Sequence, residues 1–146
     1  MTEPSTVADL VLAGAPGAPA VGAPEGAAPL TYAALADQAA RTVERLNALG
    51  IGRGDRVAMV LPNGPESATA FVCIAAAATT APLNPTYRAE EFEFYLSDLG
   101  AKALVVQAGA ESPALAVAGK LGIPVVELHP ERARGAGAFR LEPMRP

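Results

Sequence analysis

Apolar and polar positions alternate along the chain in two kinds of block, one with a helical period and one almost continuously apolar. At positions 32, 35, 39, 43 and 46 apolar side chains recur every three or four residues, which predicts one face of an amphipathic helix. Thr31 is suited to cap its first turn, and Gly50 can end it because glycine adopts the left-handed conformation without a Cβ clash. After a Gly-Arg-Gly-Asp turn, residues 56–61 are almost entirely apolar, which favours a strand covered on both faces.

The same alternation continues towards the C-terminus. The pattern predicts helices at residues 66–78, 88–99 and 113–122 and strands at residues 80–84, 102–107 and 124–128. Strands that alternate with helices are typical of an α/β fold, here a doubly wound, mostly parallel sheet with helices on both faces. Ahead of this region we expect a short helix at residues 7–12 and a brief strand at residues 20–21.

The chain of 146 residues divides into three parts by composition. Residues 1–29 form an N-terminal segment rich in Pro, Gly and Ala, residues 30–128 form the α/β subdomain, and residues 129–146 form a polar tail. This tail carries 4 Arg and 2 Glu, so it is weakly basic in a chain whose net charge is −4. The simplest interpretation of the tail is a solvated terminus. The acidic balance and the lack of a basic stripe argue against nucleic-acid binding.

The compartment is predicted from the cysteine and from the N-terminus. The sequence contains one cysteine, Cys73, which cannot form an internal disulfide and lies in an apolar run, so we expect a small buried side chain in a reducing cytosol. The first ten residues lack the basic region of a secretory signal. The apolar stretch at residues 68–83 is shorter than the about 20 residues that span a bilayer. We therefore expect a cytoplasmic protein without a membrane span.

Few side chains offer evident chemistry. In a doubly wound sheet, ligands bind beyond the carboxyl ends of the strands, which are here followed by loops at residues 62–64, 84–88 and 107–112. Neither the dinucleotide-binding nor the P-loop glycine pattern occurs. His129, the single histidine, has no evident partner and is expected at the surface. One His and one Cys are too few for a zinc site.

Two further patterns have plain structural interpretations. The acidic residues Glu90, Glu91 and Glu93 could hold magnesium or act in acid–base chemistry. At the start of a helix, however, such residues are favoured by the helix dipole and are more often solvated. Residues 53–55 spell Arg-Gly-Asp, and we interpret them as a turn. No catalytic or metal-binding residue is assigned from these patterns.

Four stretches in this order resemble the opening of the adenylate-forming superfamily. They are LTYAAL at residues 30–35, GIGRGDRVAMVLPNGPE at 50–66, CIAAAATTAPLNP at 73–85 and EEFEFYLSDLGAKALVV at 90–106. The first matches the opening motif L-[TS]-Y-x-E-L, except that Ala34 replaces the glutamate. That glutamate would complete a capping box with Thr31, so its loss weakens the helix by about 0.5–1 kcal/mol. The resemblance covers residues 28–128 and is greatest to the oxalate and fatty acyl-CoA ligase branch.

The resemblance implies an AMP-forming acyl-CoA synthetase, related to luciferases and peptide-synthetase adenylation domains. Such an enzyme uses ATP, Mg²⁺ and CoA to activate a small carboxylic acid. The family's phosphate loop, adenine-binding segment, ribose-binding aspartate and C-terminal lysine are not in this sequence, so the cofactor-binding residues are unknown. The chain is therefore expected to be the N-terminal part of such a ligase, inactive alone, with the remainder of the enzyme as its partner.

Two alternatives stay open at this point. The parent could adenylate an amino or aryl acid for a carrier protein, or the chain could be a non-catalytic binding module that keeps the fold. Because a partial domain exposes surface that the missing part would cover, we also expect self-association.

Overall fold

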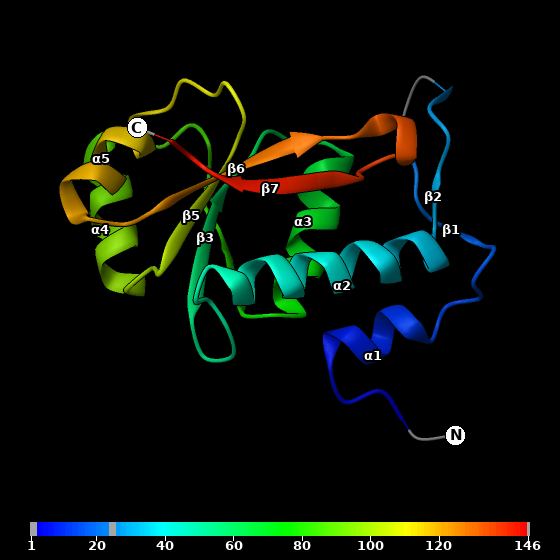
Figure 1. The fold of residues 1–146 in the computed structure, drawn as a ribbon. Coiled ribbons are helices and arrows are strands. Elements are labelled where there is room, and N and C mark those ends of the chain that lie inside the picture. The colour runs from blue at the N-terminus through cyan, green and yellow to red at the C-terminus, as the bar shows by residue number, and fades with distance from the viewer. Residues whose placement is uncertain (1–2, 24–25, 146) are drawn as a thin grey trace.

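The computed structural model describes residues 3–23 and 26–145, and it contains an α/β sheet with helices on both faces (Figure 1). The elements in chain order are α1 (Val7–Leu12), β1 (Pro19–Val21), β2 (Leu30–Thr31), α2 (Tyr32–Ala48), β3 (Arg56–Val60), α3 (Pro65–Ala75), β4 (Thr79–Pro82), α4 (Ala89–Leu99), β5 (Ala103–Gln107), α5 (Pro113–Leu121), β6 (Val125–Pro130), the 3-10 helix η2 (Arg132–Arg134) and β7 (Phe139–Pro143).

The main sheet has the strand order β4-β3-β5-β6-β7. The first four of these strands are parallel to their neighbours, and β7 runs antiparallel to β6 at the edge. β1 and β2 form a separate antiparallel pair. The predicted α/β class with a mostly parallel sheet is therefore confirmed.

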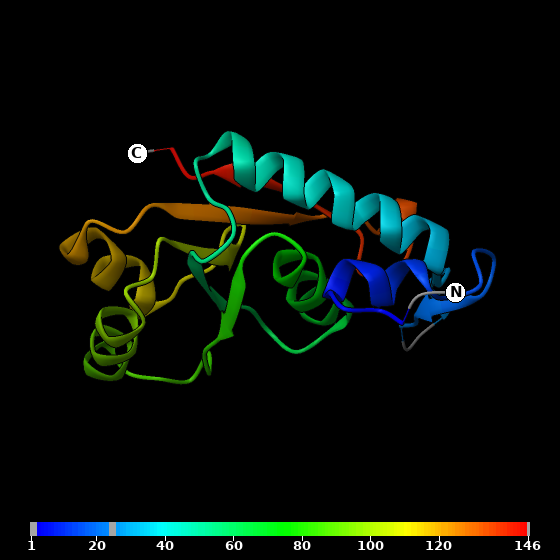
Figure 2. The same cartoon turned by 90° about the horizontal axis from the view of Figure 1, so that it is seen from below.

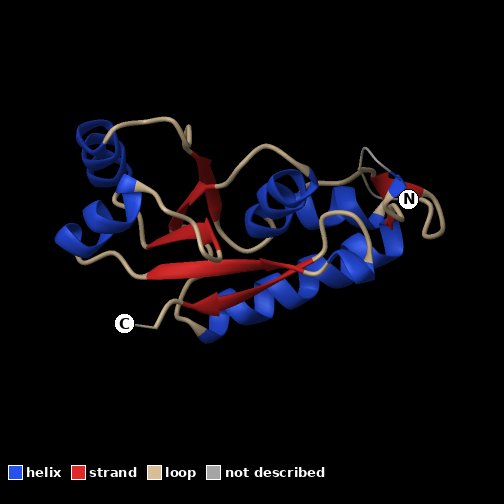
Figure 3. Cartoon of the chain, turned by 90° about the horizontal axis from the view of Figure 1, so that it is seen from above, coloured by secondary structure: helices blue, strands red, loops and turns tan. Residues whose placement is uncertain are grey.

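Helices cover both faces of the sheet because the central strands are apolar on both faces. Successive side chains of a strand point to opposite faces. Val57 and Met59 accordingly join a core with α2 and α3, whereas Ala58 and Val60 join a second core with α4 and α5. Figure 3 shows the strands between these helical layers. The near-continuous apolar run at residues 56–61 therefore forms a strand that is covered on both faces, as predicted.

The start and end of α2 follow the sequence signals. The Thr31 hydroxyl accepts a hydrogen bond from the Ala34 amide at 3.1 Å, which caps the first turn. The last helical residue is Ala48, and Gly50 follows with φ +80°, in the left-handed region expected of it. The short helix α1 packs against α2, beside its N-terminal part (Figure 2).

The interpretation of residues 129–146 as a solvated terminus is wrong. β6 continues to Pro130, and residues 139–143 form β7, with Phe139 and Leu141 buried in the core. Arg140 lies between them and is exposed. The segment therefore has the period-two pattern of a half-buried edge strand. Its arginines and glutamates dominated the composition and obscured this short alternation.

Side chains of α2 form hydrogen bonds with the free backbone edge of β7. An edge strand presents backbone groups that have no partner within the sheet. Here the Gln38 Oε1 accepts a hydrogen bond from the Phe139 amide at 3.1 Å, and the Arg45 Nε donates to the Leu141 carbonyl at 3.0 Å. Gln38 is buried, and its amide also donates to the Thr42 hydroxyl at 3.4 Å. α2 is therefore both a covering layer and the partner of an edge strand.

Close backbone packing fixes the turn that leads into β7. Gly137 has φ +83°, and a Cβ at this position would lie 2.2 Å from the Thr69 Oγ1 and 2.8 Å from the Pro65 carbonyl oxygen. A larger residue would therefore clash with the first turn of α3 as well as strain the backbone. This contact ties the turn before β7 to the N-terminal end of α3.

Replacing Gln38 by Leu should lower the free energy of unfolding by about 1–3 kcal/mol, because the buried Phe139 amide would lose its acceptor. Urea denaturation followed by circular dichroism measures this change. The matched control is Asn47→Leu at an exposed position of α2, where a change within about 0.5 kcal/mol is expected. Equal stability of the two variants would show that the Gln38–Phe139 hydrogen bond does not stabilise β7.

Candidate functional site

The strand order locates a candidate site between β3 and β5. From β3 the chain passes to β4 on one side and then to β5 on the other side of β3. In open α/β sheets, ligands bind at such a switch point, outside the carboxyl ends of the strands. The loops that follow β3, β4 and β5 meet at this edge. They are the loops predicted at residues 62–64, 84–88 and 107–112.

Two adjoining hollows lie along this edge. The first, of about 320 Å³, lies at the switch point and is lined by Val60, Pro62, Pro85 and residues 107–112. The second, of about 580 Å³, extends towards β4 and is lined by residues 59, 61–63, 67 and 82–86. Pro62 and Pro85 line both hollows. We call the two hollows together the strand-end groove.

Polar side chains at the strand-end groove hold the loops in shape. The Asn84 Oδ1 accepts hydrogen bonds from the Thr86 amide at 2.9 Å and from the Thr86 hydroxyl at 2.8 Å, which forms an Asx turn. The Ser112 hydroxyl accepts from the Ala114 amide at 3.1 Å and caps α5. β4 ends at Pro82 rather than at residue 84 because this turn follows it.

The groove lining supplies little chemistry. Among the described residues that line it, Glu111 is the one ionisable side chain, and the others are mainly Pro, Ala, aliphatic and small polar residues. Acyl transfer and phosphate binding require cationic groups or donors that stabilise developing charge. The strand-end groove can therefore form an apolar wall, but its own residues do not form a binding site for ATP and Mg²⁺.

The acidic residues at the start of α4 have structural roles. The Glu91 Oε1 accepts a hydrogen bond from the Arg88 amide at 3.1 Å, before the first turn of the helix. Glu93 pairs with Lys120 of α5 at 2.8 Å, and Glu90 is exposed. Within the described part of the chain, no group of three or more His, Cys, Asp or Glu side chains is placed to hold a metal ion.

Cys73 is fully buried in the core beside α2, as the sequence predicts. Burial disfavours the thiolate and raises the pKa of Cys73 to about 12, with a smaller opposing effect of the nearby Thr42 side chain. The thiol is therefore protonated at neutral pH and is unsuited to nucleophilic catalysis.

His129 and the Arg-Gly-Asp tripeptide have no catalytic setting. His129 lies in β6 opposite Arg140 and is half-buried rather than at the open surface. Within residues 3–23 and 26–145 its side chain has no hydrogen-bond partner. Asp55 closes the predicted turn by accepting a hydrogen bond from the Gly52 amide at 2.9 Å.

The ion pair between Glu66 and Arg132 connects distant segments and was not predicted from the sequence. The Glu66 carboxylate is buried at the start of α3 and accepts a hydrogen bond from the Arg132 Nε at 2.8 Å. Glutamate in a first helical turn is ordinary because the helix dipole favours it. Nothing in the local sequence around Glu66 therefore indicates a partner 66 positions away.

The chain belongs to the AMP-binding enzyme family, whose profile matches residues 9–138. It is 47% identical over 96 residues to an oxalate–CoA ligase of Arabidopsis thaliana, which covers 64% of this chain and 19% of that protein. It is 40% identical over 106 residues to a feruloyl-CoA synthase of Amycolatopsis, with 70% and 22% covered. The chain thus spans about a fifth of the length of these curated relatives.

Solved structures show the same fold. The crystal structure of apo MatB from Rhodopseudomonas palustris superimposes with a TM-score of 0.73 at 24% identity, covering 96% of this chain and 30% of that one. The fold is therefore that of the N-terminal part of an adenylate-forming enzyme. Among the described residues, no helix is long and apolar enough to cross a membrane.

The folded protein should resist alkylation of Cys73 by iodoacetamide at pH 8, because the thiol is buried and its pKa is about 12. Unfolding in urea should expose it and allow complete modification, which mass spectrometry measures. Since the folded pKa lies above that of an exposed thiol, stability should be unaffected below about pH 8 and should fall as the pH rises above the ordinary thiol pKa of about 8.5. Rapid modification of the folded chain at pH 8 would contradict the burial of Cys73.

Proposed function

We propose that this chain is the N-terminal part of an AMP-forming acyl-CoA ligase that activates a carboxylic acid. The observation that carries the proposal is the match of residues 9–138 to the AMP-binding enzyme family, in a chain that spans 19% of the oxalate–CoA ligase it resembles. The relatives named above are CoA ligases or synthases, which favours CoA over a carrier protein as the acyl acceptor.

The proposed reaction has two steps. A substrate carboxylate attacks the α-phosphate of ATP to form an acyl-adenylate and pyrophosphate, and the thiol of CoA then displaces AMP. Charge on the phosphates must be stabilised in both steps, which requires positioned cationic or metal groups. The strand-end groove lacks such groups among its described residues. These groups are therefore expected in the remainder of the parent enzyme.

The role of this chain in the proposed reaction is to form one rigid wall of the active-site cleft. The loops after β3, β4 and β5 are held by the buried strands, by the Asn84 turn and by the Ser112 cap. A groove fixed in this way can form one side of a cleft that the rest of the enzyme completes. We place the protein in the cytosol because its one cysteine is a buried thiol without a role in a disulfide.

The isolated 146-residue chain should release no pyrophosphate from ATP with any carboxylic acid, because the strand-end groove lacks phosphate-binding groups. A coupled pyrophosphate assay with oxalate, a fatty acid and ferulic acid measures this, with the longer parent protein as the positive control. Pyrophosphate release by the short chain would show that its own residues perform the adenylation.

The parent enzyme distinguishes the remaining alternatives. It should release AMP when ATP, an acid and CoA are supplied together. Loading of a carrier protein without AMP release on CoA would replace the proposal by adenylation for a carrier. A parent that binds acids or nucleotides but forms no acyl-adenylate would instead be a non-catalytic module.

The isolated chain should self-associate through apolar surface that the parent enzyme would cover. On α4, Phe94 is 63% exposed and lies against Tyr95, which stacks on Tyr87 at 5.1 Å between ring centroids. Light scattering over a range of concentrations should show oligomers, and Phe94→Ser should weaken them, because it removes exposed apolar area. Ser97→Ala, at an exposed position of the same helix, is the control. A monomer at every concentration would contradict self-association.

A further inference from the structure

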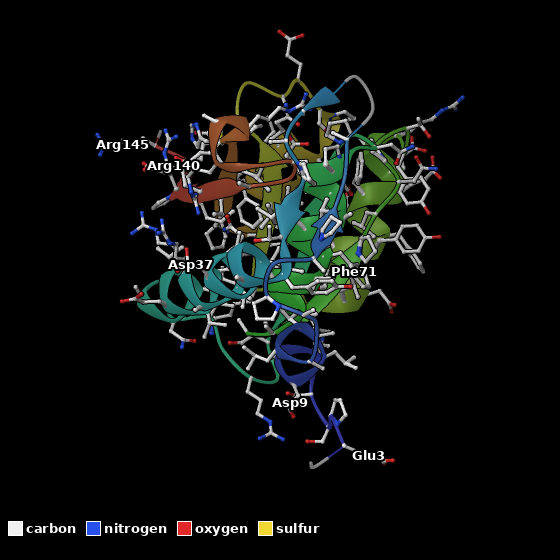
Figure 4. All side chains as sticks on the ribbon, turned by 90° about the vertical axis from the view of Figure 1, so that its right-hand side faces the viewer. Glu3, Asp9, Asp37, Phe71, Arg140 and Arg145 are labelled. Carbon is white, nitrogen blue, oxygen red and sulfur yellow. The ribbon has the colours of Figure 1, made fainter. Side chains whose placement is uncertain are left out.

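Another hollow lies between α2 and β7, on a different part of the molecule from the strand-end groove. Its volume is about 310 Å³, and Gln38, Thr42 and Phe139 contribute to its lining. Figure 4 shows Asp37 of α2 and Arg140 of β7 on the same side of the molecule. Four arginines from three elements line it: Arg41 and Arg45 of α2, Arg134 of η2 and Arg140 of β7.

The cationic groups of this arginine pocket outnumber the carboxylates that pair with them. Three carboxylates form ion pairs with three of the four arginines. The ion pairs are Arg41–Asp37 at 2.8 Å, Arg134–Asp37 at 4.0 Å, Arg134–Glu131 at 2.5 Å, Arg140–Glu131 at 4.0 Å and Arg140–Glu142 at 3.4 Å. One positive charge is therefore left over in a chain with a net charge of −4.

Arg45 carries this excess charge. Its Nε donates to the Leu141 carbonyl at 3.0 Å, which fixes the guanidinium at the pocket wall. No carboxylate among the described residues forms an ion pair with it. The remaining N–H groups of a guanidinium form a planar fork that suits two oxygens of one oxyanion.

The other arginines can turn to a ligand at little cost. The side chains of Arg41 and Asp37 are 60% and 56% exposed, and those of Arg140 and Glu142 are 51% and 47% exposed. Ion pairs as exposed as these are worth about 0–1 kcal/mol. A phosphate group, which carries more negative charge than a carboxylate, can therefore compete with Asp37 and Glu142 for the arginines.

We propose that the arginine pocket between α2 and β7 is a binding site for a phosphate-bearing ligand, with Arg45 as its fixed anchor. The ligand is bound by the arginines from three elements, and β7 is required to bring Arg140 to α2. The proposal does not rest on ligase activity, because it concerns side chains of this chain away from the strand-end groove.

Binding of inorganic pyrophosphate to the 146-residue chain, followed by NMR shifts of the arginine Nε–H groups, tests the proposal. We expect saturable shifts of Arg41, Arg45, Arg134 and Arg140, with a dissociation constant on the order of 1 mM or tighter. Arg45→Gln should weaken binding about tenfold, as expected for loss of one charge-assisted contact. Arg45→Lys should recover part of the affinity, because it keeps the charge without the fork.

Control variants distinguish binding at the arginine pocket from a general effect of the protein's charge. Arg53→Gln removes an equal charge from the turn before β3 and should leave the affinity unchanged. Arg41→Gln, at an exposed position that is not bonded to β7, tests the pocket if Arg45→Gln unfolds the chain. Saturable binding that both Arg53→Gln and Arg41→Gln leave unchanged, or the absence of saturable binding, would overturn the proposal.

A parallel measurement distinguishes a soluble ligand from a lipid. Vesicles of phosphatidylcholine with and without phosphatidic acid are sedimented with the protein. Sedimentation that depends on phosphatidic acid and is lost in Arg45→Gln assigns the site to a lipid headgroup. Pyrophosphate binding without sedimentation assigns it to a soluble phosphate compound.

Discussion

The burial of β3 and β5 on both faces is the constraint on which the rest of the structure depends. Five of their side chains, Val57, Ala58, Leu104, Val105 and Ala103, are fully buried. A strand that is apolar on both faces must be covered on both, so the helices divide between two layers and form two cores. Parallel strands joined by helices also end at one edge of the sheet. The position of the strand-end groove follows from the same constraint.

The edge of the sheet at β7 is not covered by a further strand and is stabilised in a different way. β7 brings an unpaired backbone edge next to α2, and two side chains of that helix, the buried Gln38 and the exposed Arg45, supply the missing partners. The same arrangement gathers arginines of α2, η2 and β7 around one pocket. α2 therefore has three roles: it covers the sheet, it pairs with the edge strand, and it carries the fixed arginine of the proposed phosphate site.

The described residues of the strand-end groove build a scaffold and do not supply the reacting groups. The polar groups at the strand-end groove are occupied in shaping loops, and the family's motifs at residues 30–35 and 82–85 build a helix cap and a turn. Membership of the AMP-binding enzyme family rests on most of the chain, whereas the reacting groups are not among the described residues of the groove. This division agrees with a chain that spans about a fifth of its curated relatives.

The sequence by itself determined the elements whose signals are local. The period of α2, its Thr31 cap and Gly50 end, the buried strand β3, the burial of Cys73 and the three loops of the groove were all predicted, because each depends on residues within a few positions. Only the tertiary structure decided that the C-terminal segment forms an edge strand and which distant residues hold it in place, as two of these links show. Phe139 meets Gln38 across 101 positions and Arg132 meets Glu66 across 66, so neither partner leaves a local signal. A polar residue in a helix or strand has the same local pattern whether water or a distant backbone group satisfies it, and only the fold determines which.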